Sequence, residues 1–298
     1  MKRRWRDFPV AVGMLAPSAI ILAVFVVYPL IRAVQLGHLR CDATGTRCRE
    51  GGWVQYIDVF RSNEFQHALA NTTKLAVMTV PIGLALGIGL AVLADKQIRG
   101  VGMFRTMFSS TVATSVAVAS LVWFVLLQPQ VGLLPDLFHG LIPALKQPGL
   151  LQDATTALPA VAVSSIWASL GFTFIVMTAA LQGIPRELYE SAFVDGAGGW
   201  MRFTNVTLPM LGPTIVFTTV VLTTRAFQAY AEIALLTQGG PNPERPTESM
   251  AYLIYGQTSL IKNDIGLKSS AAVLLFFVLL VLALVQFRGL DRRVHYGN

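Results

Sequence analysis

The sequence predicts an all-α fold, a polytopic membrane protein with six transmembrane helices, and three observations carry this prediction. Of 298 residues, 54% are hydrophobic and 13% are charged, whereas roughly 25% of the residues in an average soluble protein are charged. The mean hydropathy is +0.58. Six apolar stretches reach the length of about 20 residues that a helix needs to cross about 30 Å of hydrocarbon. We therefore expect residues 1–298 to form one transmembrane domain.

The six expected spans follow one another with polar connections between them. The first follows four basic residues and resembles a signal peptide. However, its 24 uncharged residues from Phe8 to Ile31 exceed the apolar core of about 7 to 15 residues in a cleaved signal, so we expect a retained helix. The second contains Gly83 and Gly87, a spacing that allows a neighbouring helix to pack closely. The expected spans are residues 10–31, 72–94, 106–127, 158–181, 211–236 and 269–287.

Lysine and arginine are unevenly distributed among the connections. With the N-terminus inside, the inner segments hold 12 Lys and Arg in 59 residues, and the outer segments hold 9 in 102. The positive-inside rule then predicts a multi-pass protein of the cell membrane with both termini in the cytoplasm. The formal charge of +7 reflects this topology and gives little support to nucleic-acid binding.

Two cysteines, Cys41 and Cys48, lie in the first outer connection. In an oxidising exterior they could form a disulfide that holds this connection, and in a reducing compartment they would remain free. The nearby imidazoles of His38 and His67 do not complete any zinc-binding spacing, so we expect no metal site.

Between the fourth and fifth spans, residues 184–209 have the pattern of two short helices joined by a turn. Pro185 can begin a helix because its missing N–H costs nothing in the first turn, and Glu187 lies near the positive helix end. Asp195-Gly196 supplies the stop, since glycine accepts the left-handed conformation that ends many helices. A second helix runs to Leu208-Pro209. An ordinary amphipathic loop on the membrane surface is the alternative.

The same segment resembles the cytoplasmic coupling loop of permease subunits in binding-protein-dependent ABC importers. The family pattern is Glu-Ala-Ala, three residues, Gly, nine residues, Ile, one residue and Leu-Pro. The spacing is intact here, with Ser191 in place of the first Ala and Val206 in place of Ile. Both replacements are small or similar in volume.

This resemblance implies a type I importer permease fold and a helix-turn-helix lever that docks on an ATPase subunit. The implied partners are a second homologous permease subunit, an ATPase dimer and an extracytoplasmic solute-binding protein. The chain has no Gly-Lys pair and hence no phosphate-binding loop. We therefore expect a non-catalytic transport subunit that binds no cofactor, with ATP and Mg2+ on the partner ATPase. The residues implied in coupling are Glu187, Glu190, Ala192, Asp195, Gly196, Ala197, Phe203, Leu208 and Pro209.

Arg225 falls near the centre of the fifth expected span, where a charge costs about 2.5 to 3.5 kcal/mol. Gln228 and Glu232 follow at three and seven residues, on the same face of a continuous helix, with Tyr230 on a different face. A direct ion pair between Arg225 and Glu232 is not expected, because they would lie about 10 Å apart along the axis. We expect these four residues to line the substrate path. The alternative is a buried charge compensated by a neighbouring helix or sister subunit.

Short strings extend the resemblance over most of the chain. Asn71-Thr72 matches this permease family, and Leu236 to Pro241 looks like the Thr-x-Gly-Gly-Pro segment of sugar-type permeases of the maltose class. Ser269 to Ala272 and Val285 to Arg288 are similar to the first permease subunit of importers for glycerol-3-phosphate and its diesters. The implied function is half of a translocation pore for glycerol-3-phosphate or a glycerophosphodiester, with a di- or oligosaccharide as the alternative solute.

Two other classes of protein compete with this interpretation. A secondary transporter would favour an inverted repeat or intramembrane carboxylates, and neither is clear in this chain. A membrane enzyme would need a nucleophile or metal cluster, but the four histidines, at positions 38, 67, 139 and 295, lie outside the expected spans.

Overall fold

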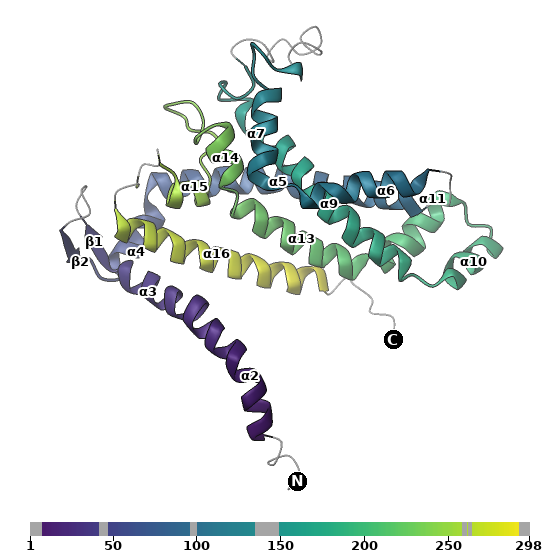
Figure 1. Cartoon of the computed structure of the whole chain (residues 1–298), viewed down its shortest axis with the longest axis horizontal. Helices are drawn as coiled ribbons and strands as arrows, with labels where there is room; N and C mark the ends of the chain where they lie inside the picture. The colour runs from purple at the N-terminus through teal and green to yellow at the C-terminus, as the bar shows by residue number, and fades with distance from the viewer. Residues whose placement is uncertain are drawn as a thin grey trace.

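The structure is a computed structural model that describes residues 8–41, 47–95, 100–134, 149–257, 261 and 264–291. Helices α5, α9, α13 and α16 run side by side along the long axis, and the N-terminal helix leans away from them (Figure 1). The helices are α2 (Phe8–Leu22), α3 (Tyr28–Leu36), α4 (Val54–Arg61), α5 (Asn63–Asp95), α6 (Val101–Ser110), α7 (Val116–Leu126), α9 (Ala157–Gln182), α10 (Arg186–Val194), α11 (Gly199–Arg202), α12 (Leu208–Met210), α13 (Gly212–Phe227), α14 (Ala231–Leu236), α15 (Met250–Tyr255) and α16 (Ile265–Asp291).

Four helical stretches among the described residues are long and apolar enough to cross a membrane: 12–36, 63–95, 157–182 and 265–288. Two bent helix pairs would bring the number to six if each pair is one span. An all-α membrane fold is therefore confirmed, and six is the upper figure for its spans. Most of the terminal basic residues behind the predicted orientation, at positions 2, 3, 4, 6, 292 and 293, lie outside the described residues.

The first span continues beyond its predicted end. A π-helical turn at Ala23–Val27 joins α2 to α3, which ends at Leu36. The second span is also longer than predicted, because α5 already begins at Asn63. A hydropathy average detects the apolar core of a helix but not the polar residues at its ends. The first and second helices are therefore longer than predicted only at their ends.

The third expected span, 106–127, is not one straight helix. Helix α6 and the 3-10 turn Thr111–Ala113 meet α7 at 104°. Thr114 has ψ 125° and Ser115 has ψ 137°, so two consecutive extended residues interrupt the helix. The prediction of a continuous helix was wrong here, because the apolar run contains no Gly or Pro that would reveal the break.

The fifth expected span, 211–236, is also broken. Helix α13 ends at Phe227, and α14 starts only at Ala231. The backbone carbonyl of Ala229, within the break, accepts a hydrogen bond from Ser249 Oγ at 2.7 Å. The prediction that Arg225, Gln228 and Glu232 share one helix face was therefore wrong, since Glu232 belongs to a different helix.

Close packing of α5 on α9 holds the centre of the bundle. A Cβ added at Gly87 would overlap with Cγ2 of Thr173, whereas one added at Gly83 would lie 3.6 Å from Ser169 Oγ. The expected small-residue contact in the second span is therefore present, and it is tightest at Gly87. Phe174 and Met177 of α9 are fully buried on the same side of the bundle.

One end of the bundle carries a two-stranded antiparallel hairpin, β1 (Leu39–Cys41) and β2 (Cys48–Glu50), closed by a disulfide between Cys41 and Cys48. Gln55 Nε2 donates to the Leu39 carbonyl at 2.8 Å. Ser270 Oγ of α16 donates to the Gly37 carbonyl at 2.9 Å. The hairpin is thus fastened to the start of α16.

The connection from α14 to α15 is packed onto the same end. Arg245 and Glu248 form a buried ion pair, with Nε to Oε2 at 2.8 Å. Burial raises the pKa of Glu248, and the charge of Arg245 opposes that rise. Asn71 Nδ2 donates to the Arg245 carbonyl at 3.2 Å, and Thr72 Oγ1 accepts from the Met250 backbone N–H at 2.9 Å. These bonds tie the connection to α5.

Candidate functional site

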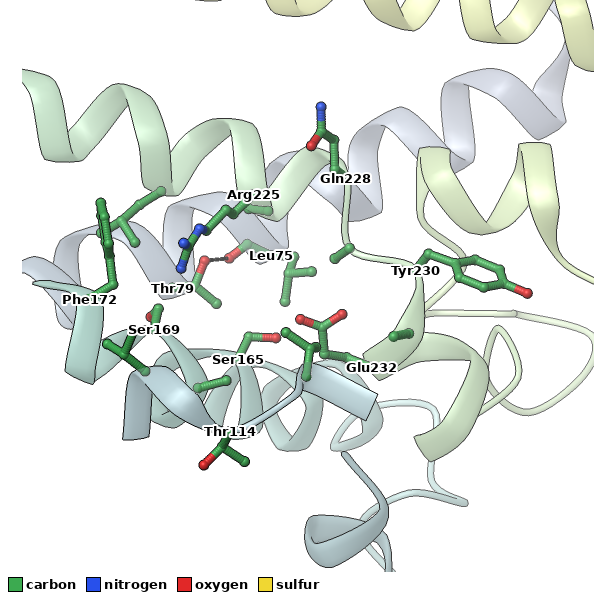
Figure 2. A pocket seen from close by; sticks show the side chains of 17 residues that line it. Leu75, Thr79, Thr114, Ser165, Ser169, Phe172, Arg225, Gln228, Tyr230 and Glu232 are labelled. Atoms are coloured by element: carbon green, nitrogen blue, oxygen red, sulfur yellow. Dashed lines mark hydrogen bonds between the residues drawn. The ribbon is translucent and has the colours of Figure 1, made fainter. Parts of the chain in front are cut away.

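Two regions of the structure hold the residues that the sequence singles out. The first is a helical hairpin made of α10 and α11, which lies at the end of the molecule opposite the β-hairpin (Figure 1). The second is a cavity between α5, α7, α9, α13 and α14 that contains several polar side chains and is drawn in Figure 2.

The turn of the helical hairpin depends on Gly196. Its φ is +78°, in the left-handed region that favours glycine. The Ala197 N–H donates to the Ala192 carbonyl at 2.9 Å, and the Gly196 N–H donates to the Phe193 carbonyl at 3.0 Å. This pair of bonds is a Schellman motif, which satisfies the last carbonyl groups of α10. The predicted stop at Asp195-Gly196 is therefore where the helix ends. Pro185 precedes α10 as its N-cap rather than occupying the first turn.

The second arm begins as the short helix α11 and continues through a π-helical turn, Phe203–Thr207, into α12. The rings of Trp200 and Phe203 lie 5.6 Å apart. This arm meets α13 at an angle of 66°. A movement of the hairpin would therefore reach α13 through only a few residues around Leu211.

The base of the hairpin is anchored in the bundle. Tyr189 of the first arm and Thr207 of the second share a hydrogen bond between their hydroxyls at 3.0 Å. Tyr189, Phe203 and Val206 pack against a buried cluster that includes Phe174 and Leu211. The two arms are thus joined to each other and to α9.

The tip of the hairpin is apolar and exposed. Fractional exposures are 68% for Phe193, 84% for Val194, 76% for Trp200 and 54% for Met201. Arg202 lies over the Phe193 ring at 5.7 Å, which adds a charge beside the patch. Exposed apolar patches of this kind mark interaction surfaces. Sequence reasoning missed Val194 and Met201, although their apolar character in a polar segment was a usable signal.

The predicted coupling residues are spread over both sides of the hairpin. Four carry their side chains or backbone into solvent: Glu187, Glu190, Asp195 and Gly196. Ala192, Ala197 and Phe203 are half-buried between the arms or against the bundle. Leu208 and Pro209 are exposed at the start of α12.

The cavity has a volume of about 520 Å³ and collects all four residues predicted for the substrate path. Arg225 comes from the end of α13, Gln228 and Tyr230 from the break, and Glu232 from α14. The broken helix, rather than one continuous face, brings them to the same cavity. The ring of Tyr230 stacks on Tyr252 with the ring centroids 6.2 Å apart, and it points away from the centre of the cavity in Figure 2.

Arg225 provides the positive side of the cavity. Its guanidinium carbon lies 4.5 Å from the centre of the Phe172 ring, so one face of the group rests on an aromatic surface. It forms no ion pair with any residue in the described part of the chain. Its edge therefore remains available to donate hydrogen bonds into the cavity.

Four hydroxyl-bearing residues that sequence reasoning missed also line the cavity: Thr79 from α5, Thr114 from the break before α7, and Ser165 and Ser169 from α9. The Ser165 hydroxyl is buried without a hydrogen-bond partner among the described residues. The spacing of four residues between Ser165 and Ser169 placed them on one face of α9, but only the packing against α13 shows which face it is.

A family comparison identifies the class of protein. Residues 83–296 match the family described as binding-protein-dependent transport system inner membrane component. The sn-glycerol-3-phosphate transport system permease protein UgpA of Agrobacterium fabrum is 30% identical over 289 residues, with 95% of each chain covered. The protein of the same name from Brucella abortus shows the same identity and coverage. That from Escherichia coli is 30% identical over 95% of this chain and 94% of its own.

Solved structures show the same fold. A chain from a bacterial ABC transporter involved in the import of the acidic polysaccharide alginate superposes with a TM-score of 0.80 at 25% identity, covering 98% of both chains. A chain from a bacterial alginate ABC transporter in complex with an alginate pentasaccharide-bound periplasmic protein gives 0.78 at 24%, covering 96% of this chain and 95% of its own. The chain therefore belongs to the binding-protein-dependent transport system inner membrane component family, and it is a permease component of an ABC importer.

Proposed function

We propose that this chain forms half of the pore of an ATP-driven importer for glycerol-3-phosphate or a glycerophosphodiester. Its single transmembrane domain pairs with a second, homologous permease. An ATPase dimer docks on residues 184–209, and an extracytoplasmic binding protein delivers the solute. ATP and Mg2+ belong to the ATPase, and this subunit performs no chemistry of its own. No nucleic acid takes part.

The observation that carries the proposed solute is the position of Arg225 in the cavity. A guanidinium presents N–H donors in a planar fork that matches two oxygens of a phosphate. The Phe172 ring lies against one face of that fork. The permease relatives named for sn-glycerol-3-phosphate transport support the same solute class.

The proposed coupling rests on the helical hairpin. Its apolar tip supplies a contact surface for the ATPase, and its base packs against α9 and leads directly into α13. Arg225 is near the end of α13, so a displacement of the hairpin can be transmitted along one helix to the cavity. The continuous path from hairpin to cavity is the reason for assigning both to one transport cycle.

The orientation of the chain is proposed from two independent features. The disulfide between Cys41 and Cys48 favours an oxidising compartment for the β-hairpin end. The helical hairpin lies at the opposite end of the long axis (Figure 1), which would place it in the cytoplasm within reach of an ATPase. The distribution of Lys and Arg predicts the same arrangement, with both termini inside.

An uptake competition assay tests the proposed solute. The assembled transporter with its binding protein would be placed in proteoliposomes containing ATP, and labelled glycerol-3-phosphate uptake would be measured against unlabelled glycerophosphodiesters and disaccharides. We expect phosphate compounds to compete and neutral disaccharides not to compete. Uptake that only a saccharide inhibits would refute the phosphate assignment while leaving the permease assignment intact.

A saccharide is the second candidate solute. The structural similarity to chains of an alginate importer favours it, and a guanidinium can also hydrogen-bond sugar hydroxyls. Alginate is polyanionic, however, and the cavity offers a carboxylate, Glu232, together with Arg225. This charge balance favours a smaller solute with a single anionic group.

A further inference from the structure

We propose that the cavity has two electrostatic ends, and that Glu232 determines specificity by rejecting solutes that carry an anion at both ends. Arg225 would hold the phosphate, and Glu232 would accept hydrogen bonds from the hydroxyls at the other end of the molecule. This inference rests on the proposed function, because it assumes a phosphate-bearing solute.

The geometry places opposite charges on separate elements around one space. Figure 2 shows the guanidinium of Arg225 and the carboxylate of Glu232 pointing into the same cavity, from α13 and from α14. The three non-helical residues from Gln228 to Tyr230 separate the two helices. Because Ser249 bonds the Ala229 carbonyl within this break, the two charged residues are held on a fixed support.

The two charges do not neutralise each other. Among the described residues, neither Arg225 nor Glu232 has an ion-pair partner. Opposite charges attract when they can meet, yet these two groups line the same cavity of about 520 Å³ without pairing. A solute that bridges them would satisfy both.

The chemistry of the two ends differs. A guanidinium only donates hydrogen bonds, and an ionised carboxylate only accepts them. A carboxylate therefore binds the two neighbouring hydroxyls of a glycerol group, and it repels a second anion at the same position. The buried Ser165 hydroxyl, which has no partner among the described residues, lines the same cavity and offers a further hydrogen-bonding group to a solute. Glu232 thus has a role that Arg225 alone cannot perform.

A matched pair of compounds tests this role. Glycerol-3-phosphate and 3-phosphoglycerate differ only in that a hydroxymethyl group is replaced by a carboxylate. Binding of each would be measured directly on the assembled transporter in nanodiscs, without the binding protein, so that the selectivity of the pore itself is read. We expect the wild type to bind 3-phosphoglycerate at least about tenfold more weakly, because two like charges would face each other. Glu232→Gln, which keeps size and removes charge, should reduce this difference to about threefold or less.

Two controls keep the outcome interpretable. Glu244→Gln removes an exposed carboxylate outside the cavity and should leave the discrimination unchanged. The methyl ester of 3-phosphoglycerate lacks the second anion, so it should bind the wild type as tightly as glycerol-3-phosphate does. This comparison of compounds needs no variant. Equal discrimination by wild type and Glu232→Gln, or rejection of the methyl ester, would overturn the role of Glu232 alone. Binding of neither phosphate compound by the wild type would overturn the proposed solute class and this inference with it.

Discussion

Replacing Gly196 should uncouple ATP hydrolysis from transport without removing the protein from the membrane. The φ of Gly196 is +78°, and a Cβ added there would meet nothing within 4 Å. The cost of a side chain is therefore purely conformational. A left-handed backbone costs an ordinary L-residue about 1 to 2 kcal/mol, which lowers the population of the native turn by a factor of about 5 to 30.

The size of the effect should follow the residue introduced at position 196. Asn tolerates the left-handed region best, Ala is intermediate, and the β-branched Val is the least compatible. We expect uptake per ATP hydrolysed to fall in the order Asn, Ala, Val. Solute uptake and ATP hydrolysis would be measured together in proteoliposomes that contain the complete importer.

Gly198 supplies the matched control for this series. It lies two residues further along the same exposed turn, its φ is −67° and its ψ is 171°, and an added Cβ again meets nothing within 4 Å. Gly198→Ala should therefore retain coupled uptake. If Gly196→Val transports with normal coupling, or if Gly198→Ala is as defective as Gly196→Ala, the turn is not the rigid joint of the lever.

Three further predictions test the cavity and the packing. Arg225→Gln should reduce uptake about 10- to 100-fold, since a charge-assisted hydrogen bond contributes about 1.5 to 3 kcal/mol. Size-exclusion chromatography should still show an intact complex. Unchanged uptake would remove Arg225 from the substrate path. Gly87→Val should lower the thermal stability in detergent, because overpacking costs about 1 to 3 kcal/mol. Gly89→Val should not lower it, since no atom lies within 4 Å of a Cβ added at position 89. Equal melting temperatures of the two variants would contradict the packing of α5 on α9. Replacing Cys41 and Cys48 together by Ser should destabilise the protein by about 2.5 kcal/mol, because the disulfide closes a loop of about eight residues. If neither this change nor a reductant lowers the melting temperature, the β-hairpin does not depend on the disulfide.

Local signals in the sequence were sufficient to predict the helical hairpin. The turn at Gly196 needs only one glycine and the carbonyls of the preceding helical turn, so its chemistry is contained in a few consecutive residues. The same is true of the apolar spans, whose length and composition are properties of single segments. The breaks within the third and fifth spans are different. Near Ser115 and Ala229, the sequence has no Gly or Pro at the break, and a hydropathy window averages over the bend.

The cavity could be predicted only in part, and one reason given for it was wrong. Arg225, Gln228 and Glu232 were grouped because a continuous helix would align them, yet they meet because the helix is interrupted. The residues that complete the cavity, such as Phe172 and Ser165, come from α9. Their contribution depends on which face of α9 packs against α13, and the local sequence of α9 does not determine this long-range packing.

The break after α13 also explains why charged residues can be present so close to an apolar span. Unpaired backbone groups are costly away from water, so irregular backbone is tolerated only where protein or a cavity satisfies it. Here the Ser249 hydroxyl satisfies the Ala229 carbonyl, and Ser249 in turn accepts from the Tyr252 N–H at the start of α15. The connection from α14 to α15 thereby stabilises the break from one side, and the helical hairpin reaches α13 from the other. A shift of either neighbour would change the separation of Arg225 and Glu232, so solute affinity would depend on both. This arrangement predicts that Ser249→Ala, which removes the support without changing a residue that lines the cavity, weakens solute binding and leaves the helical hairpin intact. Solute binding equal to that of the wild type would show that other contacts hold the break.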